Sequence, residues 1–150
     1  MLRDDINNAL KTAMKAQDQR RVSTLRLINA AFKNADIEAR GAGKTLTDDD
    51  LNAQMQKMIK QRQESAELYD KGGRPELASQ EREEIAVITS FLPKQMSEDE
   101  VKAAVAAAVK DTGASSMKDM GRVMAALKER HAGKMDFAKA GGLVKAQLGT

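Results

Sequence analysis

The residues from 117 to the end of the chain concentrate basic side chains and lack the residue pairs of a catalytic centre. This segment holds seven Lys and Arg against three Asp and Glu, whereas residues 1–93 hold fifteen of each. A basic segment of this kind is an electrostatic footprint for an anionic partner. The alternative interpretation is a solvated surface with a slight charge imbalance. The segment therefore predicts a small helical module that offers a basic surface to a folded, negatively charged partner.

A glycine stands inside this basic segment, at a position that the spacing predicts to be helical. Lys118 and Arg122 are four residues apart and lie on the side of this predicted helix opposite an apolar stripe. Gly121 lies on the same side of the helix as Lys128. An interior glycine costs a helix about 1 kcal/mol relative to alanine. Close packing of another helix would offset this cost, and so would the approach of a phosphate backbone. The stripe consists of Met117, Met120, Met124 and Leu127, and further positive charge comes from Lys134, Lys139 and Lys145.

Other constellations that could carry chemistry are weak. The sequence has no cysteine and one histidine, His131, which excludes thiolate metal sites and a cysteine nucleophile. The segment Gly41–Thr45 resembles the end of a phosphate-binding loop, but Glu38 stands where that motif needs a glycine, and a predicted helix precedes it. We therefore predict no catalytic residues, no metal site and no cofactor.

The elements that position these residues are predicted to be helices throughout. Strong helix formers dominate the composition, and the chain has only two prolines and 3% aromatic residues. Apolar residues recur at helical spacing in seven segments, and Pro93 to Ser97 separates the fourth from the fifth. The fold class is therefore all-α, with an N-terminal four-helix domain over residues 1–93 and a small three-helix tail domain over residues 94–150.

Local signals predict several helix starts and one buried charge. Thr47 is expected to cap the third helix, and the segment Ser97–Glu100 reads as a capping box. Glu81 falls on the apolar stripe of the fourth helix, so it should be partly buried and should need a cationic partner. The candidate partners are Arg26, Lys60 and Arg62.

Targeting signals and membrane spans are not evident in the sequence. The N-terminal residues Met1–Asp5 are charged, which is not typical of a signal peptide. No apolar run approaches the roughly 18 residues that a membrane-spanning helix needs. We therefore expect a cytoplasmic protein without a membrane partner.

Several short motifs, in their order along the chain, resemble the GatB/YqeY family. In the first 93 residues they include Thr24–Leu27, Ile59–Ser65 followed by Tyr69, and Phe91–Pro93. In the tail they are Asp119–Met124, then Gly133, Lys134, Asp136 and Val144. Each motif alone is weak, but together they cover nearly the whole chain. One departure is Gly141–Gly142, which should fray the last helix.

The resemblance implies a fold and a function. The tail is similar to that of the B subunit of the glutamine-dependent aspartyl/glutamyl-tRNA amidotransferase, which recognises tRNA by shape. Carried over to this chain, the RNA-binding candidates are Lys118, Gly121, Arg122, Lys128 and Lys134. The resemblance also implies the activity label of a carbon–nitrogen ligase with glutamine as amido-N-donor. Glutamine hydrolysis needs an activated nucleophile, and no cysteine is present, so catalysis would belong to a partner protein.

Three functional hypotheses follow from these patterns. The first is a non-catalytic adaptor that binds tRNA or associates with an amidotransferase. Few aromatics are present to stack on single-stranded bases, so structured RNA such as tRNA is the favoured nucleic acid. The second is a helical protein–protein interaction module without RNA binding. The third, an autonomous enzyme, would have to release ammonia from glutamine, and we expect no such activity.

Overall fold

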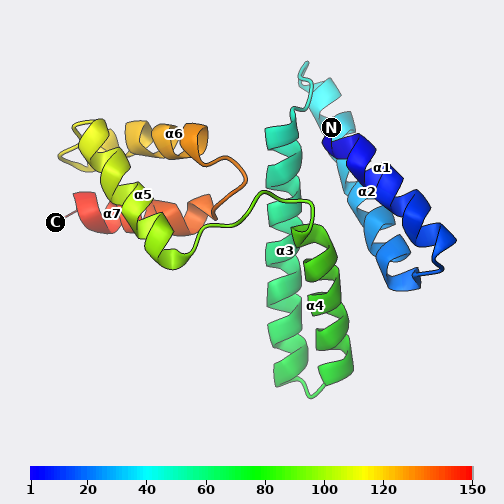
Figure 1. The fold of residues 1–150 in the computed structure, drawn as a ribbon. Helices are drawn as coiled ribbons and strands as arrows, with labels where there is room; N and C mark the ends of the chain where they lie inside the picture. The colour runs from blue at the N-terminus through cyan, green and yellow to red at the C-terminus, as the bar shows by residue number, and fades with distance from the viewer. Residues whose placement is uncertain (150) are drawn as a thin grey trace. The chain divides into compact units, whose positions relative to one another are not determined.

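The computed structural model describes residues 1–149, which form seven α-helices and one 3-10 turn with no strand (Figure 1). The predicted all-α class is therefore confirmed. The elements are α1 (Leu2–Lys15), α2 (Gln19–Gly41), α3 (Asp48–Lys71), α4 (Pro75–Thr89), α5 (Glu98–Asp111), η1 (Met117–Asp119), α6 (Met120–Arg130) and α7 (Phe137–Leu148).

The chain divides into two compact units between Leu92 and Pro93, one residue before the predicted boundary. Helices α1 to α4 belong to the N-terminal unit, residues 1–92, and α5 to α7 belong to the C-terminal unit, from residue 93 on. Their hydrophobic cores have no residue in common. That residues 1–93 and 94–150 are separate folding domains stays a prediction.

The helices begin where local sequence signals place them. The Thr47 side chain accepts a hydrogen bond from the Asp50 backbone N–H, and the Asp50 carboxylate accepts one from the Thr47 N–H at 2.9 Å. Ser97 and Glu100 form the same reciprocal capping box at the start of α5. These caps satisfy backbone N–H groups that have no partner inside the helix. Both predicted starts are therefore confirmed.

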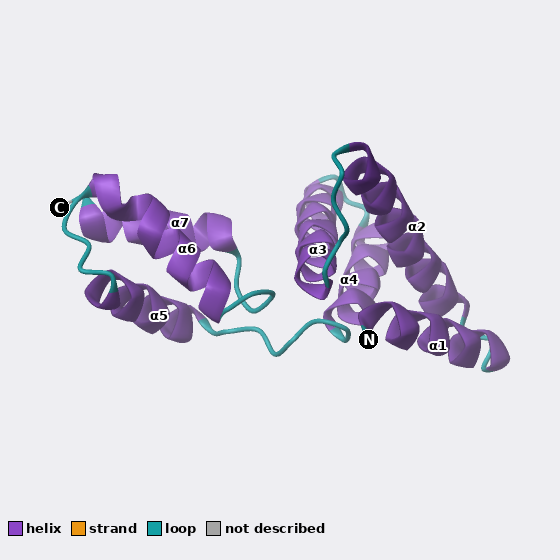
Figure 2. Cartoon of the chain, turned by 90° about the horizontal axis from the view of Figure 1, so that it is seen from above, coloured by secondary structure: helices purple, strands orange, loops and turns teal. Residues whose placement is uncertain are grey.

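The N-terminal unit is built on an aliphatic core with a single fully buried aromatic ring. Helices α3 and α4 form an antiparallel pair that turns back at Gly72 and Gly73, and α2 packs against both (Figures 1 and 2). The largest fully buried side chains of this unit are Ile6, Leu25, Ile28, Phe32, Leu51, Met55 and Ile88. Met55 shows how the core fills without aromatics, because an unbranched thioether adapts to irregular spaces.

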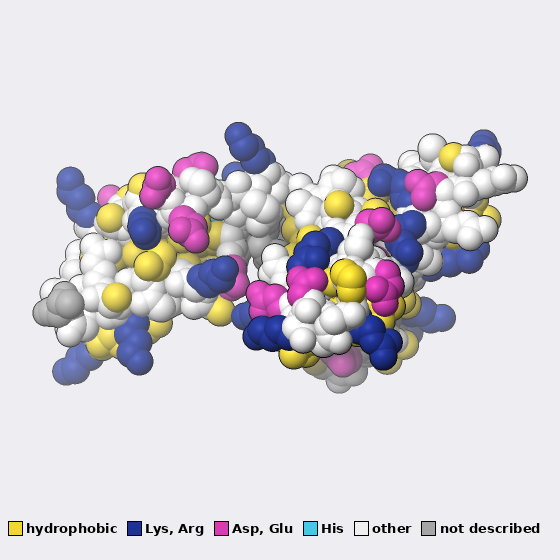
Figure 3. Space-filling model, turned by 90° about the horizontal axis from the view of Figure 1, so that it is seen from below, with side chains coloured by type: hydrophobic (Ala, Val, Ile, Leu, Met, Phe, Trp, Pro, Cys, Tyr) yellow, Lys and Arg dark blue, Asp and Glu magenta, His cyan; other side chains and the backbone are white. Residues whose placement is uncertain are grey.

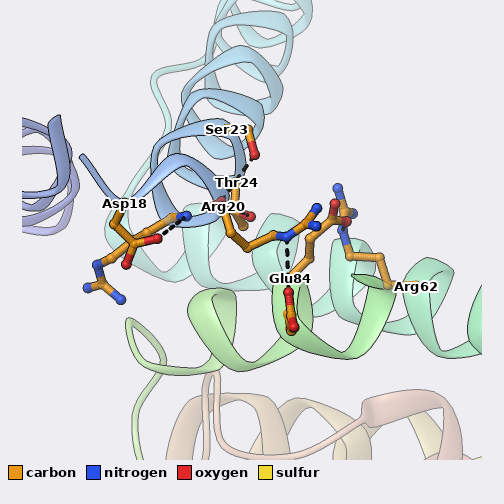
Figure 4. A network of polar contacts seen from close by, with 8 residues as sticks. Asp18, Arg20, Ser23, Thr24, Arg62 and Glu84 are labelled. Carbon is orange, nitrogen blue, oxygen red and sulfur yellow. Dashed lines mark hydrogen bonds and ion pairs between the residues drawn. The ribbon is translucent and has the colours of Figure 1, made fainter. Parts of the chain in front are cut away.

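A buried ion pair joins α3 to α4, but the carboxylate is not the predicted one. Arg62 Nε donates to Glu84 Oε2 at 2.9 Å, and the two side chains are only 15% and 10% exposed (Figure 4). Arg62 Nη1 also donates to the Met58 carbonyl at 3.2 Å. The predicted partial burial of Glu81 is therefore confirmed, but Glu84 rather than Glu81 forms the ion pair with Arg62. Glu84 lies one turn before the buried Ile88 and shares its inward face, whereas Glu81 is only half-buried.

The charges of this buried pair nevertheless affect the pKa of Glu81. Burial raises the pKa of Glu81 above its ordinary value of 4.5, repulsion from Glu84 adds to the rise, and attraction by Arg62 opposes it. Because the folded pKa is raised, the stability contributed by a protonated Glu81 is present below about pH 4.5 and is lost as the pH rises through the folded pKa.

We predict that Glu81→Gln stabilises the protein at pH 7 and has little effect below pH 4. Glutamine is of similar size and removes the charge that burial disfavours. Urea unfolding at the two pH values measures the difference. Glu64→Gln, at an exposed position of α3, is the matched control and should leave the stability at pH 7 nearly unchanged. An equal effect of Glu81→Gln at both pH values would contradict the assignment.

The C-terminal unit is a three-helix bundle in which each helix contacts the other two (Figure 2). Val105 of α5, Val123 and Leu127 of α6, and Val144 of α7 are buried at its centre. Leu148, at the end of α7, is buried together with Val144. The helix α7 continues through Gly141 and Gly142 to Leu148, so the structure shows no break at the two glycines.

The methionine stripe predicted for the sixth helix is only partly correct. Met120 and Met124 pack against the core, but Met117 is exposed and Val123 is buried instead. Residues 117–119 form a 3-10 turn that begins after Ser116, and the α-helix itself begins at Met120. A 3-10 turn has three residues per turn, so Met117 falls out of phase with the α-helical stripe that follows.

Candidate nucleic-acid interface

Four of the five predicted RNA-binding residues lie on or beside one exposed side of α6. We call this side the outer face of α6; it comprises Gly121, Arg122, Ala125 and Lys128, with Lys118 in the turn that precedes the helix. These four residues and Lys118 are all exposed. The buried Val123 and Leu127 occupy the opposite side of the helix. The helix is therefore anchored by its apolar side and presents small residues between basic ones.

Asp119 holds the residues that precede α6 in place through hydrogen bonds. Its carboxylate accepts hydrogen bonds from the backbone N–H groups of Ser115 at 2.9 Å and Ser116 at 3.3 Å, and one from Arg122 Nη2 at 2.5 Å. The hydrogen bond from Ser115 is the main reason why the pKa of Asp119 lies below its ordinary value, and Arg122 lowers it further. Sequence reasoning missed this role, although a carboxylate three residues after a serine is a recognisable capping signal.

Arg122 therefore has a structural partner as well as an exposed position. Its side chain is 61% exposed, and the pair with Asp119 is a surface ion pair three residues apart on the chain. Such pairs contribute little to stability, so the guanidinium can exchange the carboxylate for another anion at small cost. The neighbouring Asp119 nevertheless reduces the positive charge around Arg122. Lys118 and Lys128 form no salt bridge with any residue in the range 1–149.

Gly121 has no neighbour that would require a glycine. A Cβ atom placed there would meet nothing within 4 Å among the described residues. Close packing of another helix, which was one explanation of this glycine, is therefore wrong. The other explanation, the approach of a phosphate backbone, stays a prediction.

Gly121→Ala is expected to stabilise the folded protein by up to about 1 kcal/mol, because alanine is the better helix former and its methyl group meets no side chain or neighbouring element of residues 1–149 within 4 Å. Thermal or urea unfolding measures this change. Gly113→Ala is the matched control and should destabilise, because Gly113 has a φ of 66°. A loss of stability for Gly121→Ala would show that the glycine serves packing inside the protein.

Lys134 does not belong to the outer face of α6. It lies in the connection between α6 and α7, where its backbone N–H donates to the His131 carbonyl and its own carbonyl accepts from the Met96 N–H at 2.9 Å. It lines a hollow with Lys102 and Lys139, and no residue of the outer face of α6 lines that hollow. Figure 3 shows Lys and Arg side chains projecting from several edges of the C-terminal unit, interleaved with acidic ones. The five predicted residues therefore form two separate basic sites.

Residues 1–149 show no group of three or more His, Cys, Asp or Glu side chains that could hold a metal ion. None of the helices in this part of the chain is both long and apolar enough to cross a bilayer. The glycine-rich segment Gly41–Thr45 connects α2 to α3, and a helix rather than a strand precedes it, as predicted.

Comparison with known proteins places the chain in a family. The model of the YqeY-like proteins matches residues 3–148, almost the whole sequence. The chain belongs to the YqeY-like protein family.

The chain is also similar in sequence to two curated relatives. Altered inheritance of mitochondria protein 41, mitochondrial, from Lachancea thermotolerans is 35% identical over 88 residues, which cover 59% of this chain and 46% of the relative. The protein of the same name from Eremothecium gossypii is 34% identical over 83 residues, covering 55% and 44%. This chain thus matches about half the length of each curated relative.

The expected cytoplasmic location is contradicted by these relatives, because both are named as mitochondrial proteins. The expectation rested on composition and on the charged first residues. A small helical protein of this composition can fold in either compartment, so these features do not distinguish the two.

Proposed function

We propose that this YqeY-like protein is a non-catalytic adaptor that binds tRNA or associates with an amidotransferase. The observation that carries the proposal is the outer face of α6, where Gly121 and Ala125 separate Lys118 and Lys128. Small residues allow a partner backbone to approach the helix closely, and the two lysines have no salt bridge within residues 1–149. The similarity of residues 94–150 to the tail of the tRNA amidotransferase B subunit is part of this proposal.

The favoured nucleic acid is structured RNA. Proteins that read single strands stack bases on aromatic side chains. The C-terminal unit has one aromatic residue, Phe137, and its ring packs against the hydrophobic core. Double-helical RNA is recognised through phosphates, 2′-hydroxyl groups and shape, which needs basic and small side chains rather than aromatic ones. The outer face of α6 offers these residue types.

The proposal assigns the chemical step to a partner protein. A carbon–nitrogen ligase that uses glutamine needs an activated nucleophile to release ammonia. The sequence contains no cysteine, and its single histidine, His131, is half-buried at the end of α6. An amidotransferase activity would therefore belong to a complex in which another protein carries out the chemical step.

Filter binding of tRNA over a salt series tests the proposal. Each phosphate contact should make the affinity fall with salt, so that about three contacts give a slope of about −2 to −3 in a plot of log affinity against log salt. Gly121→Leu should weaken this binding, because a large side chain blocks the approach to the helix. Binding that is absent, or that does not change with salt, would overturn the RNA-binding function.

A second candidate is a protein–protein interaction module that does not bind RNA. The observation in its favour is the exposure of large apolar side chains on the N-terminal unit, where Leu27, Ile37 and Leu68 are 45%, 57% and 68% exposed. Pull-down after nuclease treatment distinguishes this protein–protein interaction function from tRNA binding. A single protein partner that survives the nuclease, together with no tRNA binding in the filter assay, would favour this second function.

A further inference from the structure

The C-terminal unit contains a hollow of about 480 Å³ between the beginnings of α5 and α7, separate from the outer face of α6. We call it the α5–α7 hollow. Its apolar lining comes from Met96, Val101, Met135 and Leu143, and Lys102, Lys134 and Lys139 stand around it. Methionine is common at surfaces that bind varied apolar partners, because its side chain adapts its shape.

We propose that the α5–α7 hollow docks an acidic amphipathic helix of a partner protein. Such a helix would place its apolar residues against Met96, Val101 and Leu143, which are only partly buried, and its carboxylates opposite the three lysines. This is the helix-in-groove mode of recognition, in which anchors recur at i, i+3, i+4 and i+7. The inference rests on the adaptor part of the proposed function and not on RNA binding.

The charges around the hollow favour an acidic partner. None of its three lysines forms a salt bridge within residues 1–149. Two carboxylates, Glu98 and Asp136, also line the hollow. The Asp136 carboxylate is occupied, since it accepts hydrogen bonds from the Ala138 N–H at 2.9 Å and the Lys139 N–H at 3.4 Å. Glu98 lies in the first turn of α5, where it faces the helix dipole.

Gly142 gives an independent indication that a partner approaches here. It lies inside α7, lines the hollow and is exposed, and a Cβ atom at this position would meet nothing within 4 Å. The neighbouring Gly141 differs, because its Cβ would contact Met120 Cε at 3.7 Å. Gly142 thus lowers helix propensity without a packing reason among residues 1–149. A closely seated helix would supply one.

A small organic ligand and a nucleic acid fit the hollow less well. Small-molecule sites orient their ligand with a few precisely placed polar groups. The side-chain amide N–H₂ of Gln95 is already used, because it donates to the carbonyls of Pro93 at 2.8 Å and Gly133 at 2.7 Å. The three lysines come from three different segments, α5, the connection between α6 and α7, and α7. The lining has no aromatic side chain on which a base could stack.

Selection from a library of random peptides tests this proposal on the full-length protein. The peptides would have about sixteen residues, roughly 24 Å of helix, and Gly142→Leu protein would serve to remove background binders. This variant fills the hollow and improves helix propensity, so it should fold. We expect the enriched peptides to carry Asp and Glu together with large apolar residues at helical spacing.

Fluorescence anisotropy with the most enriched peptide then locates the site. Gly142→Leu should weaken its binding by about tenfold or more, as expected for the loss of a central contact. The double variant Lys102→Glu, Lys139→Glu should weaken it as well. Gly121→Leu, at an exposed glycine in the first turn of α6, is the matched control and should leave peptide binding unchanged.

Three results would overturn the proposal: no enrichment over Gly142→Leu, enrichment of basic peptides, or binding that Gly142→Leu does not reduce. If Gly142→Leu weakened tRNA binding instead, the hollow would belong to a nucleic-acid interface. The two inferences fail separately, because loss of tRNA binding by Gly121→Leu and loss of peptide binding by Gly142→Leu are different measurements.

Discussion

Arg62→Met is expected to destabilise the protein by about 3 kcal/mol, the largest effect on stability that we predict for a single substitution. Methionine keeps much of the apolar stem but removes the guanidinium that pairs with Glu84. The carboxylate is then left in a site where its side chain is only 10% exposed. Breaking a buried pair is costly because the remaining charge has lost both water and its partner. Urea unfolding of the full-length protein measures the loss.

Two further variants make this prediction specific. The double variant Arg62→Met, Glu84→Met should recover most of the stability, because two apolar side chains can replace a buried ion pair at little cost. Arg82→Met is the matched control. Its partner is Asp70, and both side chains are about half exposed, so the loss should stay below about 1 kcal/mol. Equal losses for Arg62→Met and Arg82→Met would show that burial of the pair does not matter.

The double charge reversal Lys118→Glu, Lys128→Glu should weaken tRNA binding by about 50-fold or more at 0.1 M salt. Each lost phosphate contact removes close to tenfold at this salt concentration, and the new carboxylates add repulsion. The slope of log affinity against log salt should become shallower by about two. Filter binding with the salt series described above measures both quantities.

The control for this reversal has the same change in net charge. Lys11→Glu, Lys33→Glu alters two exposed lysines of α1 and α2 in the N-terminal unit. If the outer face of α6 contacts RNA, the control should retain most of the affinity. Similar losses for both double variants would mean that overall charge, rather than this surface, controls binding.

Features encoded within a few residues could be predicted from the sequence. The caps at Thr47 and Ser97 depend only on side chains three residues apart, and both were predicted, although the return hydrogen bond from Asp50 to Thr47 was not. The all-helical class follows from apolar spacing and composition in the same way. Arg62 was one of three predicted partners for a buried carboxylate, because helical periodicity places its stem on the apolar side of α3.

Features that depend on the relative rotation of packed helices could not be predicted. Spacing alone places both Glu81 and Glu84 near the buried side of α4, and only the packing against α3 selects Glu84. Met117 was placed in the apolar stripe because the 3-10 turn before α6 has no strong sequence signal. The two basic sites were treated as one, since a list of lysines does not show that Lys134 lines the α5–α7 hollow whereas Lys118 lies beside the outer face of α6.

The absence of shared residues between the two hydrophobic cores has a consequence for how this sequence can evolve. Effects of substitutions at distant sites without common neighbours are close to additive. Substitutions around Leu25 or Ile88 in the N-terminal core should therefore not limit which side chains are accepted around Val123 or Val144 in the C-terminal core. Selection can refine the surface that meets a partner on one half while mutations accumulate and are compensated on the other.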